Sequence, residues 1–206
     1  MITIIDYGAG NLTSIANMLK RIGVESEITH SVEKISAATK LILPGVGSFD
    51  FGISQLRNAA YFDILCKKVQ EDKVPLLGVC LGMQLLAEGS DEGTTAGLGW
   101  IKGTVTKFDA GKIKQAGLKV PHMGWTDITI KKPSKILQGL PPDAHFYFVH
   151  SYYLSPVHAG DILLTSNYGY EFTSGVEREN IVAVQFHPEK SHKYGMQLYR
   201  NFAGLY

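Results

Sequence analysis

The fold is decided by Pro75-Leu76-Leu77-Gly78-Val79-Cys80-Leu81-Gly82-Met83-Gln84-Leu85-Leu86. The apolar residues before the cysteine predict a buried parallel strand, and those from Met83 onward favour a helix. Glycines two residues before and two residues after the cysteine allow a tight turn between packed elements. This Gly-x-Cys-x-Gly pattern is typical of a nucleophile elbow, where a strand turns sharply into a helix. The stretch therefore predicts an α/β fold with a cysteine at the turn.

Two cysteines occur in the chain, and their surroundings differ. An elbow would lift the Cys80 thiol above the sheet edge and aim it into solvent, near a helix N-terminus that favours a thiolate. Free cysteine is more often buried as a small hydrophobe, and a Gly-x-Cys-x-Gly turn can also serve packing alone. Cys66 fits that structural interpretation, because residues 62, 65, 66 and 69 share one face of a predicted helix. Cys80 is the candidate nucleophile.

A candidate base follows a second strand-like run near the C-terminus. The apolar and β-branched residues 181–186 lead directly into His187-Pro188-Glu189. Proline disfavours helical backbone in the residue before it, so His187 is expected at the end of a strand. Open parallel sheets place their functional side chains at such strand ends. Glu189 can orient the imidazole, so Cys80, His187 and Glu189 are predicted to be nucleophile, base and orienting acid.

Six further histidines are spread along the chain, and none shares this proline-fixed context with a nearby acid. Two of them, His122 and His150, lie in aromatic segments that could line a cleft. A lone histidine is more often structural than catalytic.

Composition limits the fold and the possible partners. The 206 residues suffice for one α/β domain with a core, so residues 1–206 are expected to form a single domain. A net charge of +1, without a basic and aromatic cluster, argues against a nucleic-acid partner. Two cysteines form no disulfide framework, which fits a reducing cytoplasm. We expect no leader and no membrane span, since no apolar run approaches about 20 residues.

The order of predicted elements extends the fold prediction. Short strands alternate with helices in the first 90 residues, whereas residues 100–170 carry short strands without long helices. This order fits a three-layer α/β domain, with an open, mostly parallel sheet, flanking helices and a β-rich insertion. The predicted strands are residues 2–5, 40–43, 75–79, 127–130, 146–149, 162–166 and 181–186, and the predicted helices are residues 12–22, 61–72, 83–87 and 194–202.

Together these segments resemble the class I (triad) glutamine amidotransferases. More narrowly, the chain is similar to the glutaminase subunits of imidazole glycerol phosphate synthase, over essentially its whole length. The broad resemblance rests on Pro44-Gly45-Val46-Gly47, residues 78–84 and His187-Pro188-Glu189, in the family's order and spacing. The narrow one rests on residues 6–12, Pro121-His122-Met123-Gly124-Trp125, residues 146–152 and Lys190.

The resemblance implies a chemistry that needs no cofactor. Cys80 attacks the side-chain amide of glutamine, His187 passes the proton to the leaving ammonia, and Glu189 orients the histidine. A γ-glutamyl thioester forms, and water then releases glutamate. The oxyanion needs donors placed in advance. The resemblance gives this role to the Leu81 amide and to the Val46–Gly47 segment, whose glycines make a peptide flip feasible.

Substrate binding is also implied by the resemblance. Gln84 and Glu92 match positions that hold the backbone end of glutamine, with Glu92 suited to the ammonium. The backbone of Ser151 and Tyr152 suits the carboxylate. Two other interpretations stay open from the sequence: Gln84 as an ordinary polar helix residue, and Glu92 as part of a solvated Ser-Asp-Glu-Gly turn.

A separate synthase is expected to receive the ammonia, because free ammonia is largely protonated near neutral pH. In the family this partner is a (β/α)8-barrel cyclase bound as a heterodimer. Asn11, Met123, Trp125, Tyr147 and Lys190 match positions that face the barrel or gate the ammonia passage. An exposed Trp125 would suit an interface hot spot, and a core tryptophan is the alternative.

Two alternatives to the histidine-pathway glutaminase remain. The first is a paralogue that supplies ammonia to a surface-sugar amidotransferase, because Ser191-His192-Lys193-Tyr194-Gly195-Met196 is less typical of the histidine-pathway enzymes. The second is a non-catalytic regulatory subunit. The intact set of Cys80, His187 and Glu189 argues against it, since a scaffold needs none of the three.

Overall fold

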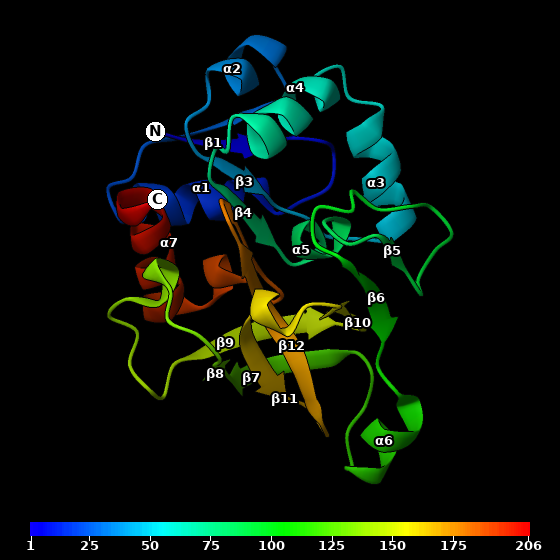
Figure 1. The fold of residues 1–206 in the computed structure, drawn as a ribbon. Coiled ribbons are helices and arrows are strands. Elements are labelled where there is room, and N and C mark those ends of the chain that lie inside the picture. Colours follow the sequence, from blue (N-terminus) through cyan, green and yellow to red (C-terminus); the bar gives the residue numbers. More distant parts are fainter.

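The computed structural model describes all residues from 1 to 206, and its centre is an eight-stranded sheet (Figure 1). The strand order is β2-β1-β3-β4-β13-β12-β11-β8. The first five of these strands pair in parallel, and the pairs from β13 to β8 are antiparallel. The strands are β1 (Ile2–Ile5), β2 (Ser26–Thr29), β3 (Leu41–Leu43), β4 (Leu76–Val79), β8 (Thr129–Ile130), β11 (Ile162–Asn167), β12 (Glu171–Arg178) and β13 (Ile181–Val184).

Two smaller sheets lie beside the antiparallel half. One is a three-stranded sheet with the strand order β10-β6-β5, and the other is the antiparallel pair of β7 and β9. Their strands are β5 (Gly89–Ser90), β6 (Gly103–Lys107), β7 (His122–Asp127), β9 (His145–His150) and β10 (Tyr152–Pro156). The fold class is therefore the predicted one, α/β with a mostly parallel sheet, flanking helices and a β-rich segment.

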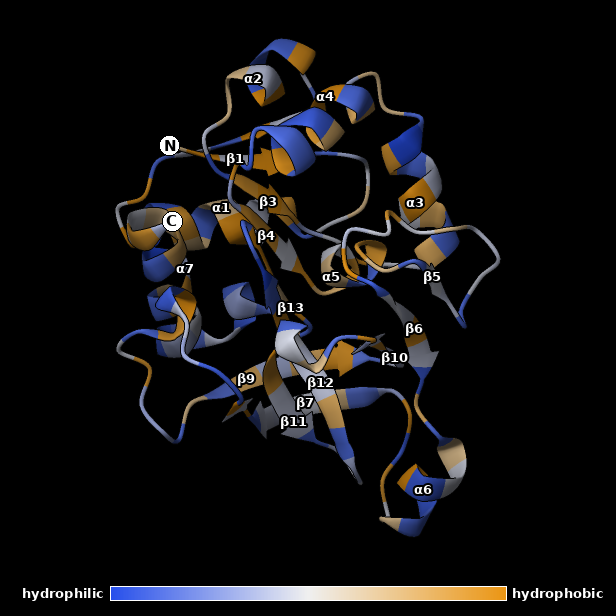
Figure 2. Ribbon diagram, in the orientation of Figure 1, coloured by the Kyte–Doolittle hydropathy of each residue, from blue (hydrophilic) through white to orange (hydrophobic).

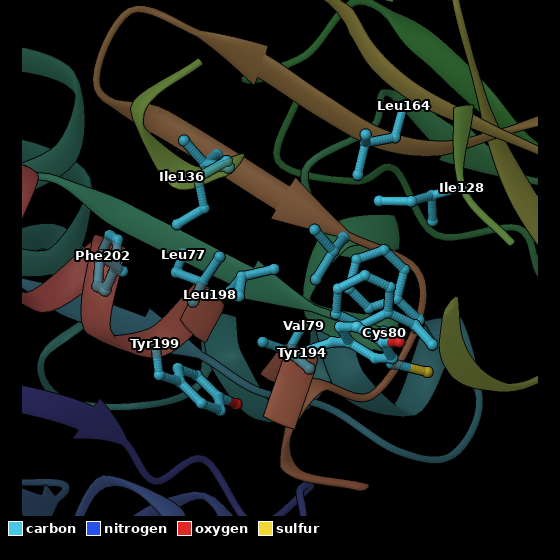
Figure 3. Close-up of a cluster of buried hydrophobic side chains, with 14 of the residues drawn as sticks. Leu77, Val79, Cys80, Ile128, Ile136, Leu164, Tyr194, Leu198, Tyr199 and Phe202 are labelled. Carbon is cyan, nitrogen blue, oxygen red and sulfur yellow. The ribbon is translucent and has the colours of Figure 1, made fainter. Parts of the chain in front are cut away.

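Helices cover both faces of the parallel strands. Four of these strands are therefore buried throughout: β1, β3, β4 and β13. Figure 2 shows β1 and β3 as hydrophobic. One core cluster joins the sheet to α1 and α7, and a second joins the opposite face to α2–α5. Figure 3 shows part of the first cluster, where Leu198 and Phe202 of α7 meet Leu77 and Val79 of β4. The helices are α1 (Leu12–Arg21), α2 (Val32–Ala37), α3 (Phe49–Arg57), α4 (Phe62–Cys66), α5 (Leu81–Leu85), α6 (Ala110–Gln115) and α7 (His192–Leu205).

Three local predictions need correction. The helix expected over residues 61–72 is α4 followed by a π-helical turn, Lys67–Glu71. Within it, Cys66 is half-buried at the edge of the core rather than inside it. The strand expected over residues 127–130 is the end of β7 and the separate β8, which pair in different sheets. None of the helices combines the length and the apolar composition needed to cross a bilayer.

Candidate active site

Cys80 stands at the sharp turn between β4 and α5, with φ of +53°. This backbone conformation is costly for a residue with a side chain, and such strain concentrates at functional sites. The neighbouring glycines make the turn possible. A Cβ on Gly82 would overlap the carbonyl oxygen of Leu43, and a Cβ on Gly78 would lie 2.9 Å from the Cβ of Ala183. The Gly-x-Cys-x-Gly pattern is thus a packing requirement of the elbow.

The Cys80 thiol is only 7% exposed, so the expectation that it points into solvent is wrong. It faces a pocket of about 350 Å³ instead. The reason is that residues from β9 and β10, together with the loops after β3 and β13, close over the end of the sheet. The pocket is lined by Val46, Gly47, Cys80, Leu81, Gln84, Glu92, Pro121, Val149, His150, Ser151, Tyr152 and His187.

His187 and Glu189 form a tight, buried pair after β13. The Nδ1 of His187 lies 2.7 Å from Oε1 of Glu189, and both side chains are almost inaccessible to solvent. The His187 Nε2 makes no hydrogen bond within the protein and lines the pocket with Cys80. Burial opposes a charge on the ring, but the Cys80 thiol and then Glu189 outweigh burial and raise the pKa of His187. The imidazolium is therefore favoured beside the sulfur.

The Leu81 amide, predicted as an oxyanion donor, already has a partner. Its N–H donates to the carbonyl oxygen of Gly45 over 3.3 Å. Because a trans peptide is planar, the N–H of Val46, in the same peptide unit, points the opposite way. A Cβ on Gly45 would lie 2.5 Å from the Tyr7 hydroxyl and 2.7 Å from the Cβ of Leu81, so only glycine fits. Val46, Gly47 and Leu81 all line the pocket, but in this conformation the two amides do not converge.

The predicted substrate-binding residues gather in the same pocket. Gln84 is buried, and its Nε2 donates to the Tyr152 carbonyl over 2.9 Å, so it is not a solvent-facing helix residue. Glu92 is half-buried, and its Oε2 accepts from the Phe49 N–H over 2.8 Å. That bond fixes the carboxylate at the N-terminus of α3, so Glu92 is held rather than freely solvated. Ser151 and Tyr152 lie across the pocket on the β9–β10 connection.

One residue beside the Cys80 sulfur was missed by the sequence analysis. Gln185 is fully buried, and its Nε2 lies 3.7 Å from the Cys80 sulfur. The alternation of strand β13 could have indicated it, because residues 185 and 187 project to the same side. His150, noted in the sequence as part of an aromatic segment that could line a cleft, does line the pocket.

Three predicted docking residues on β7 and β9 and one in the turn after β13 form a surface of exposed and half-buried side chains, which we call the docking surface: Met123, Trp125, Tyr147 and Lys190. Trp125 is 44% exposed, so the alternative of a core tryptophan is wrong. Its ring pairs across β7 and β9 with Tyr147 and stacks on His192 at 5.4 Å. The Lys190 ammonium lies 5.5 Å from the Tyr147 ring centre. Asn11 precedes α1, where its Oδ1 accepts from the Ser14 hydroxyl over 2.8 Å.

Fold and pocket together define an α/β protein of the nucleophile-elbow type. Residues 3–204 match the family described as glutamine amidotransferase class-I. The chain belongs to this family, and it is an enzyme of the glutaminase kind.

Full-length relatives and solved structures agree with this assignment. The chain is 48% identical over 100% of both lengths to "Imidazole glycerol phosphate synthase subunit HisH 2" of Pseudomonas aeruginosa. It is 52% identical to the protein of the same name in Methanococcus maripaludis, over 98% of each. Among solved structures, one described as a glutamine amidotransferase has a TM-score of 0.75 at 22% identity, covering 98% of this chain and 97% of that one. At this identity the structure supports the fold alone.

Proposed function

We propose that this chain is the glutaminase subunit of an imidazole glycerol phosphate synthase, acting in histidine biosynthesis. The observation that carries the proposal is the pocket, where a strained cysteine faces a histidine held by a buried glutamate. The names of relatives 48% and 52% identical over nearly the whole chain narrow the function to this synthase. We treat residues 1–206 as one domain, because the family match spans residues 3–204 and the central sheet joins both ends of the chain.

In the proposed reaction the Cys80 sulfur attacks the side-chain carbonyl carbon of glutamine, and a carbon–sulfur bond forms. The carbon–nitrogen bond then breaks, and the leaving nitrogen takes a proton from the His187 imidazolium to depart as ammonia. Water attacks the thioester carbon and gives a proton to His187; the carbon–sulfur bond breaks, glutamate leaves, and the Cys80 thiolate is restored beside the imidazolium. Glu189 stabilises the charged ring through its bond to Nδ1. The raised pKa of His187 keeps that proton available.

The glutamine would lie with its backbone end away from the sulfur. Glu92 offers its second carboxylate oxygen to the substrate ammonium, since Oε2 is engaged by the Phe49 amide. The backbone of Ser151 and Tyr152 faces the same pocket and suits the substrate carboxylate. The pocket volume of about 350 Å³ is at the small end of the range typical of ligand sites, as a free amino acid requires.

The oxyanion hole is switched off in this conformation, and we infer that a partner switches it on. The Gly45 carbonyl occupies the Leu81 donor, so a developing oxyanion would meet a carbonyl oxygen. A flip of the Gly45–Val46 peptide would free the Leu81 amide and turn the Val46 N–H inward. Each such donor contributes about 10²–10³ in rate. The two flanking glycines lower the conformational cost of the flip.

The proposed partner is a (β/α)8-barrel cyclase that receives the ammonia. The docking surface supports this part of the proposal, because a tryptophan, a tyrosine and a lysine gather there beside an exposed methionine. Exposed aromatic groups of this kind are typical of interface hot spots. Asn11 and the docking surface would face the barrel or gate the passage. Two free cysteines fit an assembly in the reducing cytoplasm.

The test is a steady-state glutaminase assay of the chain alone and with its cyclase partner carrying the partner's nucleotide ligand. We expect the isolated chain to hydrolyse glutamine very slowly. Partner and ligand together should raise kcat by about 10²-fold or more with a smaller change in KM, because completing an oxyanion hole stabilises the transition state selectively. A lone chain already at full speed would overturn the gated hole. A chain that no cyclase activates would overturn the proposed partner.

A second candidate is a paralogue serving another acceptor, such as a surface-sugar amidotransferase. Both relatives above carry the number 2 in their names, and we infer from it a second copy of the subunit. A duplicated subunit is free to change its acceptor while keeping its glutaminase chemistry. Neighbouring histidine genes would favour the first candidate, and neighbouring sugar-modifying genes the second.

A further inference from the structure

A chain of hydrogen bonds runs from strand β7 to the sulfur of Cys80, through side chains and one main-chain carbonyl. The bonds join Thr126 Oγ1 to His122 Nε2 (2.8 Å), His122 Nδ1 to His150 Nε2 (3.0 Å), His150 Nδ1 to the Tyr152 oxygen (2.8 Å), Gln84 Nε2 to the same oxygen (2.9 Å), Gln84 Nε2 to Gln185 Oε1 (3.0 Å) and Gln185 Nε2 to Cys80 Sγ (3.7 Å). The mechanism above uses none of His122, His150 and Gln185.

The direction of every bond follows from one group, the main-chain carbonyl of Tyr152, which can only accept. His150 must therefore donate from Nδ1, so its Nε2 accepts when the ring is neutral. His122 then donates from Nδ1 to that nitrogen, and its own Nε2 accepts from the Thr126 hydroxyl. Both rings carry their proton on Nδ1, which is the less common tautomer of free histidine.

The same carbonyl fixes the other half of the chain. Gln84 must present its NH2 group to the carbonyl oxygen, and the second hydrogen of that group points to Gln185. Gln185 accepts it with Oε1, which leaves its own NH2 group facing the sulfur. If Gln185 were turned over, two NH2 groups would meet at Gln84, and an acceptor oxygen would face Cys80.

We propose that Gln185 is a catalytic residue that donates a hydrogen bond to the Cys80 sulfur and stabilises its thiolate, and that His122 and His150 are positioning residues that hold this donor in place through Tyr152 and Gln84. The use of the thiolate rests on the proposed glutaminase function, whereas the bond and its direction do not. A hydrogen bond to a charged acceptor is stronger than one between neutral groups, so the donor favours the ionised sulfur.

Burial keeps the two rings neutral. Desolvation lowers the pKa of His122 to about 4 and that of His150 to about 3. If His150 were protonated, its Nε2–H would face the Nδ1–H of His122 across the 3.0 Å contact, so His150 accepts this bond only as a neutral ring. The aromatic rings of Phe108, Phe148 and Phe172 enclose the pair and exclude water.

Other titratable groups also act on the sulfur and must stay the same in any comparison. His187 faces it from the segment after β13, and Glu189 acts through that ring. Tyr7 faces it from the segment after β1, where its hydroxyl donates to the Pro44 carbonyl. None of these residues hydrogen-bonds to Gln185, so a change at residue 185 leaves them in place.

The test is the pH dependence of Cys80 alkylation by iodoacetamide in a Cys66→Ser background, read by mass spectrometry without glutamine or partner. Gln185→Leu keeps the side-chain length and removes the donor. We expect the pH midpoint of alkylation to rise by about one unit. Gln197→Leu is the matched control. Gln197 is also hydrogen-bonded, to the Gln138 carbonyl and to Asn201 of α7, and it does not line the pocket. The midpoint of Cys80 alkylation in this variant should stay at the value of the unmodified chain.

A second measurement uses the unmodified chain, in case Gln185→Leu does not fold. Nitrogen-15 spectra of the histidine rings should show neutral Nδ1–H tautomers for His122 and His150 at neutral pH. An unchanged midpoint in folded Gln185→Leu, or an Nε2–H tautomer at His150, would overturn the inference. Alkylation needs no glutaminase activity, so a midpoint shift in a chain that hydrolyses no glutamine even with its cyclase partner would refute only the proposed function.

Discussion

The parallel half and the β-rich half of the molecule contribute differently to the site. In the parallel half, β4 and β13 end side by side, and their carboxyl ends deliver Cys80 and His187 to one place. Helices cover both faces of these strands, so little there can move. In the β-rich half, β7 and β9 have an exposed side with Trp125 and a buried side with the histidine pair.

The proposed reactive groups therefore stand in the tightly packed half, and the exposed aromatic groups stand in the half with a solvent face. The proposed nucleophile and base follow strands that are packed on two faces, so their positions are set by the sheet register. Three residues of the docking surface, Met123, Trp125 and Tyr147, stand instead on the two-stranded ribbon of β7 and β9, which has one solvent face. The comparison predicts that changes in the parallel half abolish chemistry or folding, whereas changes in the β-rich half alter pH response and association.

The largest effect is expected at Cys80. Cys80→Ala should lower glutamine hydrolysis by about 10⁴-fold or more while the chain stays folded, because no other group can form the thioester. Cys66→Ala should keep the activity and lose about 1 kcal/mol of stability or less, since Cys66 is only half-buried. Burial raises the pKa of the Cys66 thiol, so 6-diazo-5-oxo-norleucine should label Cys80 alone. A label on Cys66 in the mass spectrum would contradict the assignment of the nucleophile.

The second effect concerns packing at the elbow. Gly82→Ala should reduce the free energy of unfolding by about 3 kcal/mol, because its methyl group would overlap backbone atoms of Leu43 that cannot move aside. Gly160→Ala in the β-rich half meets open space and should change stability by less than about 0.5 kcal/mol. Urea denaturation of both variants measures the difference. Equal losses would show that the elbow is no more tightly packed than the β-rich half.

The third effect is acid sensitivity in the β-rich half. The folded pKa values of His122 and His150, about 4 and about 3, lie below the ordinary 6.5 of the unfolded chain. The unfolded state therefore binds protons first as the pH falls. Stability should be full above about pH 7.5 and decline by about 3 kcal/mol for each ring, about 6 kcal/mol for the two, toward pH 4. His122→Gln should flatten this dependence in urea titrations, and the exposed His158→Gln should not; a slope unaffected by His122→Gln would refute the account.

The smallest effect is expected at the docking surface. Trp125→Ala should weaken binding of the cyclase partner by about 2 kcal/mol, roughly 30-fold, as for a central aromatic residue of an interface. Val157→Ala removes another exposed apolar group away from this surface and should leave the affinity unchanged. Isothermal titration calorimetry gives both values. Equal affinities of the two variants would move the interface elsewhere.

Sequence patterns predicted the parallel half best. Strand β1 was predicted residue for residue, and α1 to within one residue, because these elements are strongly apolar or amphipathic. Strands β2 and β12 were missed, since segments such as Ser26–Thr29 carry few apolar residues and are held by pairing with their neighbours. Helix α3 was missed because Asp50 and Gly52 weaken its local helix signal.

The residues of the candidate site, like the elements of the fold, could be predicted where the signal lies in a short stretch of sequence. Cys80, His187 and Glu189 stand in short motifs that can be read locally. The role of Gln185 depends on Gln84 and Tyr152, which are distant in sequence and meet only in the folded chain. The conformation of Gly45 was beyond the sequence too, because glycine permits both orientations of the following peptide.

The hydrogen bond between the Leu81 amide and the Gly45 carbonyl has a thermodynamic consequence for assembly. If the partner favours the flipped peptide, then anything else that favours the flipped peptide must favour the partner by the same factor. A ligand whose negatively charged oxygen lies in the oxyanion hole is such a factor, because it competes directly with the Gly45 carbonyl. Occupancy of the pocket by a tetrahedral adduct on Cys80 should therefore slow dissociation of the two subunits, so that ammonia is released only while its route to the synthase is closed to water.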